Sequence, residues 1–142
     1  MKTIGLDVGT KTIGVAISDA FGWTAQGLPT IQRSEDDPNR DFEALAELIK
    51  ENDVQKVVIG YPKNMNGTVG ESATRSEAFA RTLEQRCNVQ AVLWDERLTT
   101  AAAQRVLIDA DVSRKKRKKA VDKMAAVFIL QGYLDRQSHT LT

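Results

Sequence analysis

Large apolar residues alternate with small or polar ones along the first two segments of the chain. In residues 3–9, two glycines and Asp7 share one face of an extended strand, and the other face carries Ile, Leu and Val. Residues 12–19 repeat this alternation after a short Gly-Thr-Lys turn. The pattern predicts a β-hairpin, and a weaker alternation at 25–33 predicts a third strand beside it.

The remaining segments alternate between helical and strand-like patterns. Asp37-Pro38 is a helix-start signal, and largely apolar runs at 56–60 and 89–94 predict strands that are buried on both faces. Helical spacing of apolar residues is found at 42–49, 76–87, 99–109 and 121–136. This order predicts an α/β fold with a five-stranded mixed sheet, antiparallel first and parallel later, flanked by helices. We expect residues 1–138 to form a single domain, followed by a polar tail at 139–142.

Composition excludes several classes of protein. A chain of 142 residues is large enough for one domain with its own core. No apolar stretch approaches the ~20 residues of a membrane span, and the single cysteine, Cys87, can form no internal disulfide. The start of the chain leads directly into the first predicted strand. We therefore expect a cytoplasmic protein with no signal peptide and no membrane partner.

The net charge of +1 conceals a strong local asymmetry. Residues 114–119 hold six of the 20 basic residues, and the rest of the chain carries 14 basic and 19 acidic residues, a net charge of −5. Six like charges in a row repel one another and oppose the dipole at a helix start, so we expect residues 112–120 to form a mobile loop or a poorly ordered turn. On an acidic body, this run is the surface that attracts a polyanion.

Carboxylates occur at three places that the predicted fold brings to one end of the sheet. Asp7 lies on the first strand among small residues that leave room for a ligand, Asp95 and Glu96 end the last strand, and Asp122 begins the final helix. Clustered carboxylates need a cation, and oxygen-only ligands favour Mg²⁺ or Mn²⁺. Each acid also has a structural interpretation: turn bonding for Asp7, helix-dipole stabilisation for Asp122, and surface pairing with Arg97 for the other two.

Four stretches of the chain resemble one known family. They are GLDVGTKTIGVAISD, VIGYPKNMNGTVGESA, WDERLTTAAAQRVL and VDKMAAVFILQGYLD, in that order between about residues 3 and 136. The chain looks like a member of the YqgF (RuvX) family, which has the RNase H fold and is described both as pre-16S ribosomal RNA nucleases and as Holliday-junction resolvase-like. The stretch DVGT alone also resembles the first phosphate loop of actin-like ATPases and sugar kinases, but those proteins carry a second copy of the fold that this chain lacks.

The resemblance implies a nuclease and its catalytic residues. Asp7 matches the first-strand acid of RNase H-like nucleases, Asp122 matches the acid of their last helix, and Glu96 matches the third acid, with Asp95 as the alternative. Two Mg²⁺ or Mn²⁺ ions held by these acids would support hydrolysis of RNA, at the 5′ end of precursor 16S rRNA during ribosome biogenesis. The alternatives are a DNA junction resolvase, which calls for a homodimer rather than a monomer, and a catalytically inactive RNA-binding ribosome-assembly factor.

Basic and polar residues near these acids are predicted to contact the nucleic acid. The loop at 61–70 follows a parallel strand, where functional loops occur, and offers Lys63 and Asn64, although its Asn-Gly is also ordinary turn chemistry. Arg97 follows the strand-end acids and is placed to brace a scissile phosphate. The basic run contributes the other predicted contacts: Arg114, Lys115, Lys116, Arg117, Lys118 and Lys119.

Overall fold

The computed structural model describes residues 2–34, 36–61, 70–95 and 114–140, with the backbone alone at 72, 114–123 and 138–140. Its elements in chain order are β1 (Lys2–Val8), β2 (Thr12–Ser18), β3 (Ala25–Gln32), α1 (Asn39–Glu51), β4 (Val54–Tyr61), α2 (Glu71–Cys87), β5 (Gln90–Asp95) and α4 (Arg114–Thr140). The strands and helices predicted within these ranges are confirmed. The predicted helix at 99–109 and most of the predicted loop at 61–70 lie outside the described residues.

β1 is the central strand of a five-stranded sheet with the order β3-β2-β1-β4-β5. It pairs antiparallel with β2, which pairs antiparallel with β3, whereas β4 and β5 follow in parallel on the other side of β1. The predicted mixed sheet, antiparallel first and parallel later, is confirmed. The carboxyl end of β1 is therefore the point where the two halves of the sheet meet, which is where ligands gather in sheets of this kind.

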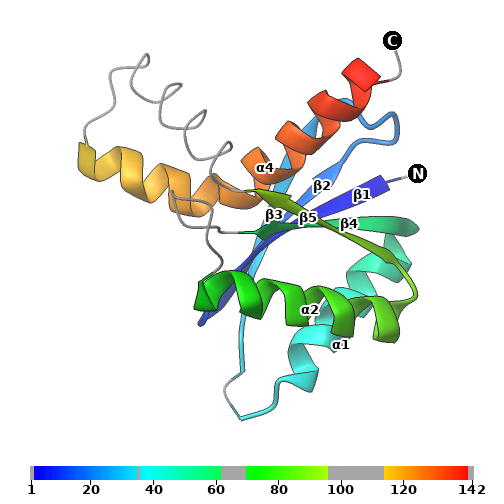
Figure 1. Cartoon of the computed structure of the whole chain (residues 1–142), viewed down its shortest axis with the longest axis vertical. Helices are drawn as coiled ribbons and strands as arrows, with labels where there is room; N and C mark the ends of the chain where they lie inside the picture. The colour runs from blue at the N-terminus through cyan, green and yellow to red at the C-terminus, as the bar shows by residue number, and fades with distance from the viewer. Residues whose placement is uncertain (1, 35, 62–69, 96–113, 141–142) are drawn as a thin grey trace.

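Helices cover both faces of the sheet (Figure 1). α1 and α2 pack on the face that carries the large apolar residues of β1 and β2, including Ile4, Leu6 and Ile13. α4 packs on the opposite face through Ile129 and Leu130. The alternation along β1 and β2 thus separates a thick apolar layer from a face of small residues.

The two parallel strands beside β1 differ in burial. In β4, Val57, Val58 and Ile59 are fully buried, as the apolar run predicts. β5 lies at the edge of the sheet and is only half-buried, with 39% of Leu93 exposed. The prediction that β5 is buried on both faces is wrong, because an edge strand has a neighbouring strand on one side only.

Glycine at position 5 lets α4 lie directly on β1. A Cβ at Gly5 would lie 2.7 Å from the Cβ of Leu130 and 3.0 Å from the carbonyl oxygen of Ala126, so a side chain there would push the helix away. On β2, a Cβ at Gly14 would lie 3.6 Å from the Cβ of Ala126. The small residues of this face therefore serve the contact with α4. The expectation that they leave room for a ligand is wrong at Gly5, where the helix occupies that space.

α4 begins at Arg114, earlier than the predicted 121–136, and runs to Thr140. The basic run at 114–119 lies in its first two turns, so the prediction of a loop at 112–120 is wrong for residues 114–120. Lysine and arginine are good helix formers, and extending a helix costs far less than starting one. These effects outweigh the charge repulsion. Within the described ranges, α4 included, no helix combines the length and apolar character needed to cross a membrane.

Replacing Gly5 with alanine should destabilise the fold by about 1–3 kcal/mol, because the added methyl group overpacks the contact with α4. Gly27→Ala is the matched control, since a Cβ at Gly27 meets only Cγ2 of Val127, at 3.4 Å. We expect the control to change the free energy of unfolding by less than about 0.5 kcal/mol. Urea denaturation measures both values, and equal effects would show that α4 does not depend on Gly5.

Candidate active site

Asp7 is the second-last residue of β1 and lies on the sheet face that α4 covers. It pairs with Gly14 of β2 within the strand ladder, and its Cβ is 3.5 Å from the position of a Cβ at Gly14. The same position at Gly14 is in contact range of Ala126 on α4. The half-buried Asp7 therefore lies at the carboxyl end of the central strand, close to the first described side chains of α4.

The backbone of α4 brings residue 122 to the same end of the sheet. Thr3, near the start of β1, lines a pocket together with Leu134, and Gly5 lies against Leu130 and Ala126, so α4 runs antiparallel to β1. Residue 122 is one turn before Ala126 and on the same side of the helix. The backbone therefore supports the prediction that Asp7 and Asp122 belong to one end of the sheet.

Asp95 lies on the other face of the sheet. It pairs in register with Tyr61, and the Tyr61 hydroxyl donates a hydrogen bond of 2.7 Å to Oε1 of Glu77 on α2. This bond raises the pKa of Tyr61 above its ordinary value of 10.0. Because side chains alternate along a strand, Asp95 shares the α2 face with Tyr61, whereas Trp94 packs with the cluster beneath α4. The structure does not bring Asp95 together with Asp7.

Several predicted site residues have no described side chain. Glu96, Lys63, Asn64 and Arg97 lie outside the described residues. The basic run is described by its backbone alone and forms the first turns of α4, before residue 122. It consists of Arg114, Lys115, Lys116, Arg117, Lys118 and Lys119. The described side chains contain no group of three or more acids, histidines or cysteines that could hold a metal ion.

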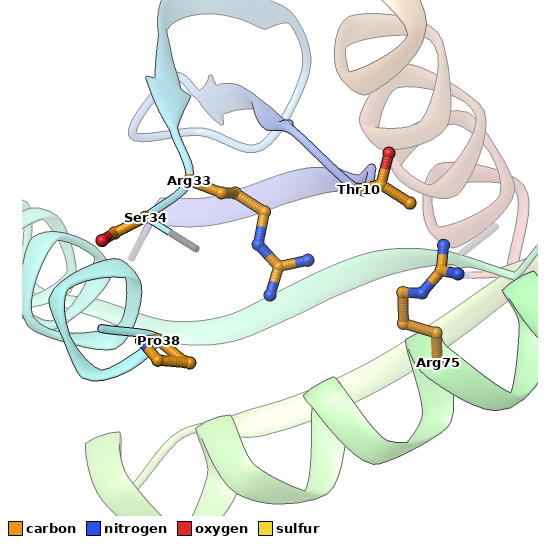
Figure 2. Close-up of a pocket in the computed structure, with 5 residues that line it drawn as sticks. All are labelled: Thr10, Arg33, Ser34, Pro38 and Arg75. Carbon is orange, nitrogen blue, oxygen red and sulfur yellow. The ribbon is translucent and has the colours of Figure 1, made fainter. Parts of the chain in front are cut away.

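A pocket of about 280 Å³ lies near the carboxyl end of β1, on the face of the sheet that α1 and α2 cover. Its lining residues come from four parts of the chain: Thr10 in the β1–β2 turn, Arg33 and Ser34 after β3, Pro38 before α1, and Arg75 on α2. Figure 2 shows the guanidinium groups of Arg33 and Arg75 on either side of it. The sequence analysis missed both arginines, because neither belongs to a motif or a charge run.

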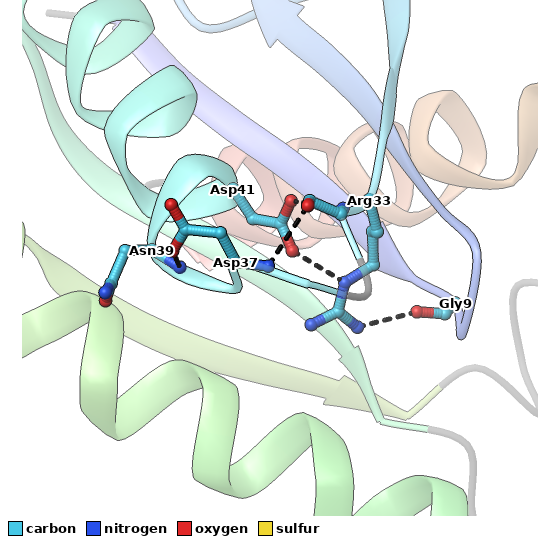
Figure 3. Close-up of polar contacts among 6 residues, drawn as sticks. Gly9, Arg33, Asp37, Asn39 and Asp41 are labelled. Atoms are coloured by element: carbon cyan, nitrogen blue, oxygen red, sulfur yellow. Dashed lines mark hydrogen bonds and ion pairs between the residues drawn. The ribbon is translucent and has the colours of Figure 1, made fainter.

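Arg33 is held in place by a buried carboxylate (Figure 3). Its Nε donates to Oδ2 of Asp41 at 3.0 Å, and its Nη1 donates to the carbonyl oxygen of Gly9 at 2.8 Å. Asp41 is only 2% exposed, and its Oδ1 also accepts a bond of 3.2 Å from the backbone N–H of Ser34. This network ties the end of β3 and the first turn of α1 to the turn that follows Asp7.

The fold and the placement of these groups can be compared with known proteins. The model of the family described as RuvX, Holliday junction resolvase, matches residues 1–136. The chain belongs to the RuvX family. The resemblance inferred from the four sequence stretches is thereby confirmed.

Relatives of this RuvX chain share one name. A protein of Shouchella clausii (strain KSM-K16) is 97% identical over 142 residues, covering 100% of both chains. A protein of Bacillus subtilis (strain 168) is 60% identical over 135 residues, covering 95% of this chain and 98% of its own. Each is named "Putative pre-16S rRNA nuclease".

Solved structures of resolvases resemble the RuvX chain in fold. RuvC of T. thermophilus in complex with Holliday junction substrate has a TM-score of 0.66 and 13% identity, covering 99% of this chain and 97% of its own. The fowlpox virus resolvase with its Holliday junction substrate has a TM-score of 0.51 and 11% identity, covering 96% and 99%. At these identities the likeness shows the fold alone, and it confirms the predicted RNase H-like class.

Replacing Arg33 with methionine should destabilise the protein by about 3 kcal/mol, because it leaves the buried Asp41 carboxylate without its partner. The double variant Arg33→Met, Asp41→Leu should recover a large part of this loss, since it removes the uncompensated charge as well. Arg81→Met, at an exposed position of α2, is the control. Denaturant unfolding of the four proteins checks this, and a double variant as unstable as the single one would contradict the ion-pair explanation.

Proposed function

We propose that the protein is a metal-dependent ribonuclease that processes the 5′ end of precursor 16S rRNA in the cytoplasm. The observation that carries the proposal is the close contact of α4 with β1, which holds residue 122 at the end of the strand that presents Asp7. Membership of the RuvX family and the name shared by its relatives favour this substrate. We also propose that residues 1–138 act as one domain, followed by the tail at 139–142.

In this proposal Asp7, Glu96 and Asp122 hold two divalent ions. The surroundings of Asp7 fit such a role, because Gly14, its partner in the strand ladder, has no side chain and Ala126 next to Gly14 is small. Bound Mg²⁺ or Mn²⁺ would supply an activated water and charge stabilisation for the leaving oxygen. Asp7 would contribute to both ion sites, and Glu96 and Asp122 would each contribute to one. The only histidine, His139, is near the far end of α4, so no histidine base enters the proposal.

The placement of Asp95 supports Glu96 as the third ligand. Asp95 shares the α2 face of the sheet with Tyr61, and Asp7 faces α4. A carboxylate on the α2 face would have to reach around the end of β5 to meet Asp7. We therefore propose that Asp95 has a structural part and that Glu96 binds metal.

The variants Asp7→Asn, Glu96→Gln and Asp122→Asn should each abolish Mn²⁺-dependent cleavage of a precursor 16S rRNA fragment, because each removes a carboxylate charge that holds an ion. Asp95→Asn is the matched control and should retain activity. Cleavage is followed on RNA and on four-way DNA side by side, with Mn²⁺ affinity measured by calorimetry in the same variants.

Three results would contradict parts of this proposal. Undiminished cleavage by Asp7→Asn would end the metal mechanism. Loss of activity in Asp95→Asn with activity kept in Glu96→Gln would reverse the assignment of the third acid. Cleavage of four-way DNA but not of RNA would identify a junction resolvase, for which a dimer in solution is expected.

Replacing Lys115, Lys116, Lys118 and Lys119 with alanine should weaken RNA binding without changing Mn²⁺ affinity. These positions lie in the first turns of α4, next to the helix turn that carries Asp122. Each lost phosphate contact should flatten the dependence of log affinity on log salt by roughly 0.7 for a single strand. Lys50→Ala, at an exposed position in the last turn of α1, is the control and should leave the slope unchanged. An unchanged slope in the lysine variant would exclude this surface from the RNA path.

A further inference from the structure

We propose that the pocket lined by Thr10, Arg33 and Arg75 is a second phosphate subsite, which binds the RNA backbone beside the cleaved bond. The inference rests on the proposed function for the identity of the ligand. The subsite itself is assigned from the pocket, which lies on the opposite face of the sheet from α4 and its basic turns. Its ligand chemistry is a phosphate oxyanion in a single-stranded nucleic acid.

The lining of the pocket suits an oxyanion. Two guanidinium groups reach it from different elements (Figure 2), and Thr10 also lines it. None of the described residues that line it is acidic. Planar guanidinium groups match the geometry of phosphate oxygens with paired N–H donors, which makes arginine the preferred residue for such contacts. The volume of about 280 Å³ is ample for a phosphate group with its bound water.

The two arginines have different tasks in this pocket. Arg33 is 18% exposed and is fixed by Asp41 and the Gly9 carbonyl, contacts that use two of the five N–H donors of its guanidinium group. Because Asp41 balances its charge, Arg33 contributes oriented donors rather than net charge. Arg75 then supplies the positive charge of the lining. A ligand meets a preformed site at Arg33, so little conformational entropy is lost there on binding.

The position of the pocket links it to the acids. Thr10 lies three residues after Asp7 in the chain, and the Gly9 carbonyl between them is bound by Arg33. Pro38 before α1 and Arg75 on α2 line the pocket, whereas α4 packs on the other face of the sheet. An RNA strand that crosses from one face of the sheet to the other at the carboxyl end of β1 would pass Asp7. On one side of Asp7 it would meet the basic turns of α4, and on the other side the pocket. This path would carry the RNA backbone past the α4 turns, the acids and the pocket in turn.

The test compares two arginines of the same helix. Arg75→Gln removes the charge that lines the pocket, and Arg81→Gln removes an exposed charge of α2 outside it. Binding of a single-stranded oligouridylate to the full chain is measured by fluorescence anisotropy over a series of KCl concentrations, with EDTA present so that no cleavage occurs. We expect Arg75→Gln to lose roughly tenfold in affinity and about 0.7 in salt slope, and Arg81→Gln to match the wild type. Thermal unfolding verifies that both variants are folded.

A second measurement distinguishes RNA from a free anion. The Nε–Hε resonance of Arg75 is followed by nuclear magnetic resonance during titration with oligouridylate and, separately, with inorganic phosphate. We expect the oligouridylate to shift the resonance at far lower concentration. A shift with inorganic phosphate alone would make the pocket a small-anion site and overturn the proposal.

The outcomes separate this inference from the proposed function. Equal affinity and equal salt slope in Arg75→Gln and Arg81→Gln would overturn the subsite, even if the wild-type protein cleaves RNA. Weaker binding by Arg75→Gln alone would support the subsite, even if the wild-type protein shows no metal-dependent cleavage. Weaker binding without cleavage would contradict the ribonuclease proposal but would still support RNA binding in the pocket.

Discussion

The contact between α4 and β1 determines how residues 7 and 122 lie relative to each other. Gly5 lets α4 rest on β1 at a distance that one additional methyl group would not permit. Protein interiors are packed too densely to absorb such a change without movement of an element. The distance between β1 and α4 therefore depends on Gly5, and the proposed metal ligands Asp7 and Asp122 are carried by these two elements.

Charge is distributed around this contact in a way that favours a polyanion. The first turns of α4 carry six basic residues at the end of a helix where the dipole already favours negative charge, and no acid of the chain offsets them in that first turn. On the other face, Arg33 is held by a buried carboxylate and Arg75 lines the pocket beside it. A bound nucleic acid would relieve the repulsion among the basic residues and complement the helix start. The remainder of the chain, with its net charge of −5, would repel the same ligand elsewhere.

Local patterns predicted the elements well but not the contacts between distant ones. The alternation in residues 3–9 predicts β1 and the face of Asp7. Asp41 looked like any acid in a first helical turn, and only the tertiary fold shows that it is buried against Arg33. The half-burial of β5 depends on its place in the strand order, which its own residues do not encode. At 114–120 the run of like charges predicts a loop, but helix propensity and the packed second half of α4 outweigh the repulsion.

The chain order of these elements has a consequence for folding. β1, β2, β3 and α1 follow one another, so the hairpin pairs and the Arg33–Asp41 ion pair join residues that are close in sequence. The contact of Gly5 with Leu130 joins residues that are almost the whole chain apart. Because contacts between distant residues carry the larger loop-closure cost, they form late in folding. In a nascent chain, the strands that carry Asp7 and position Arg33 would thus fold before α4 packs on the sheet. The proposed metal ligands Asp7 and Asp122 would then come together only in the last step of folding. An incompletely folded protein would therefore not cleave RNA.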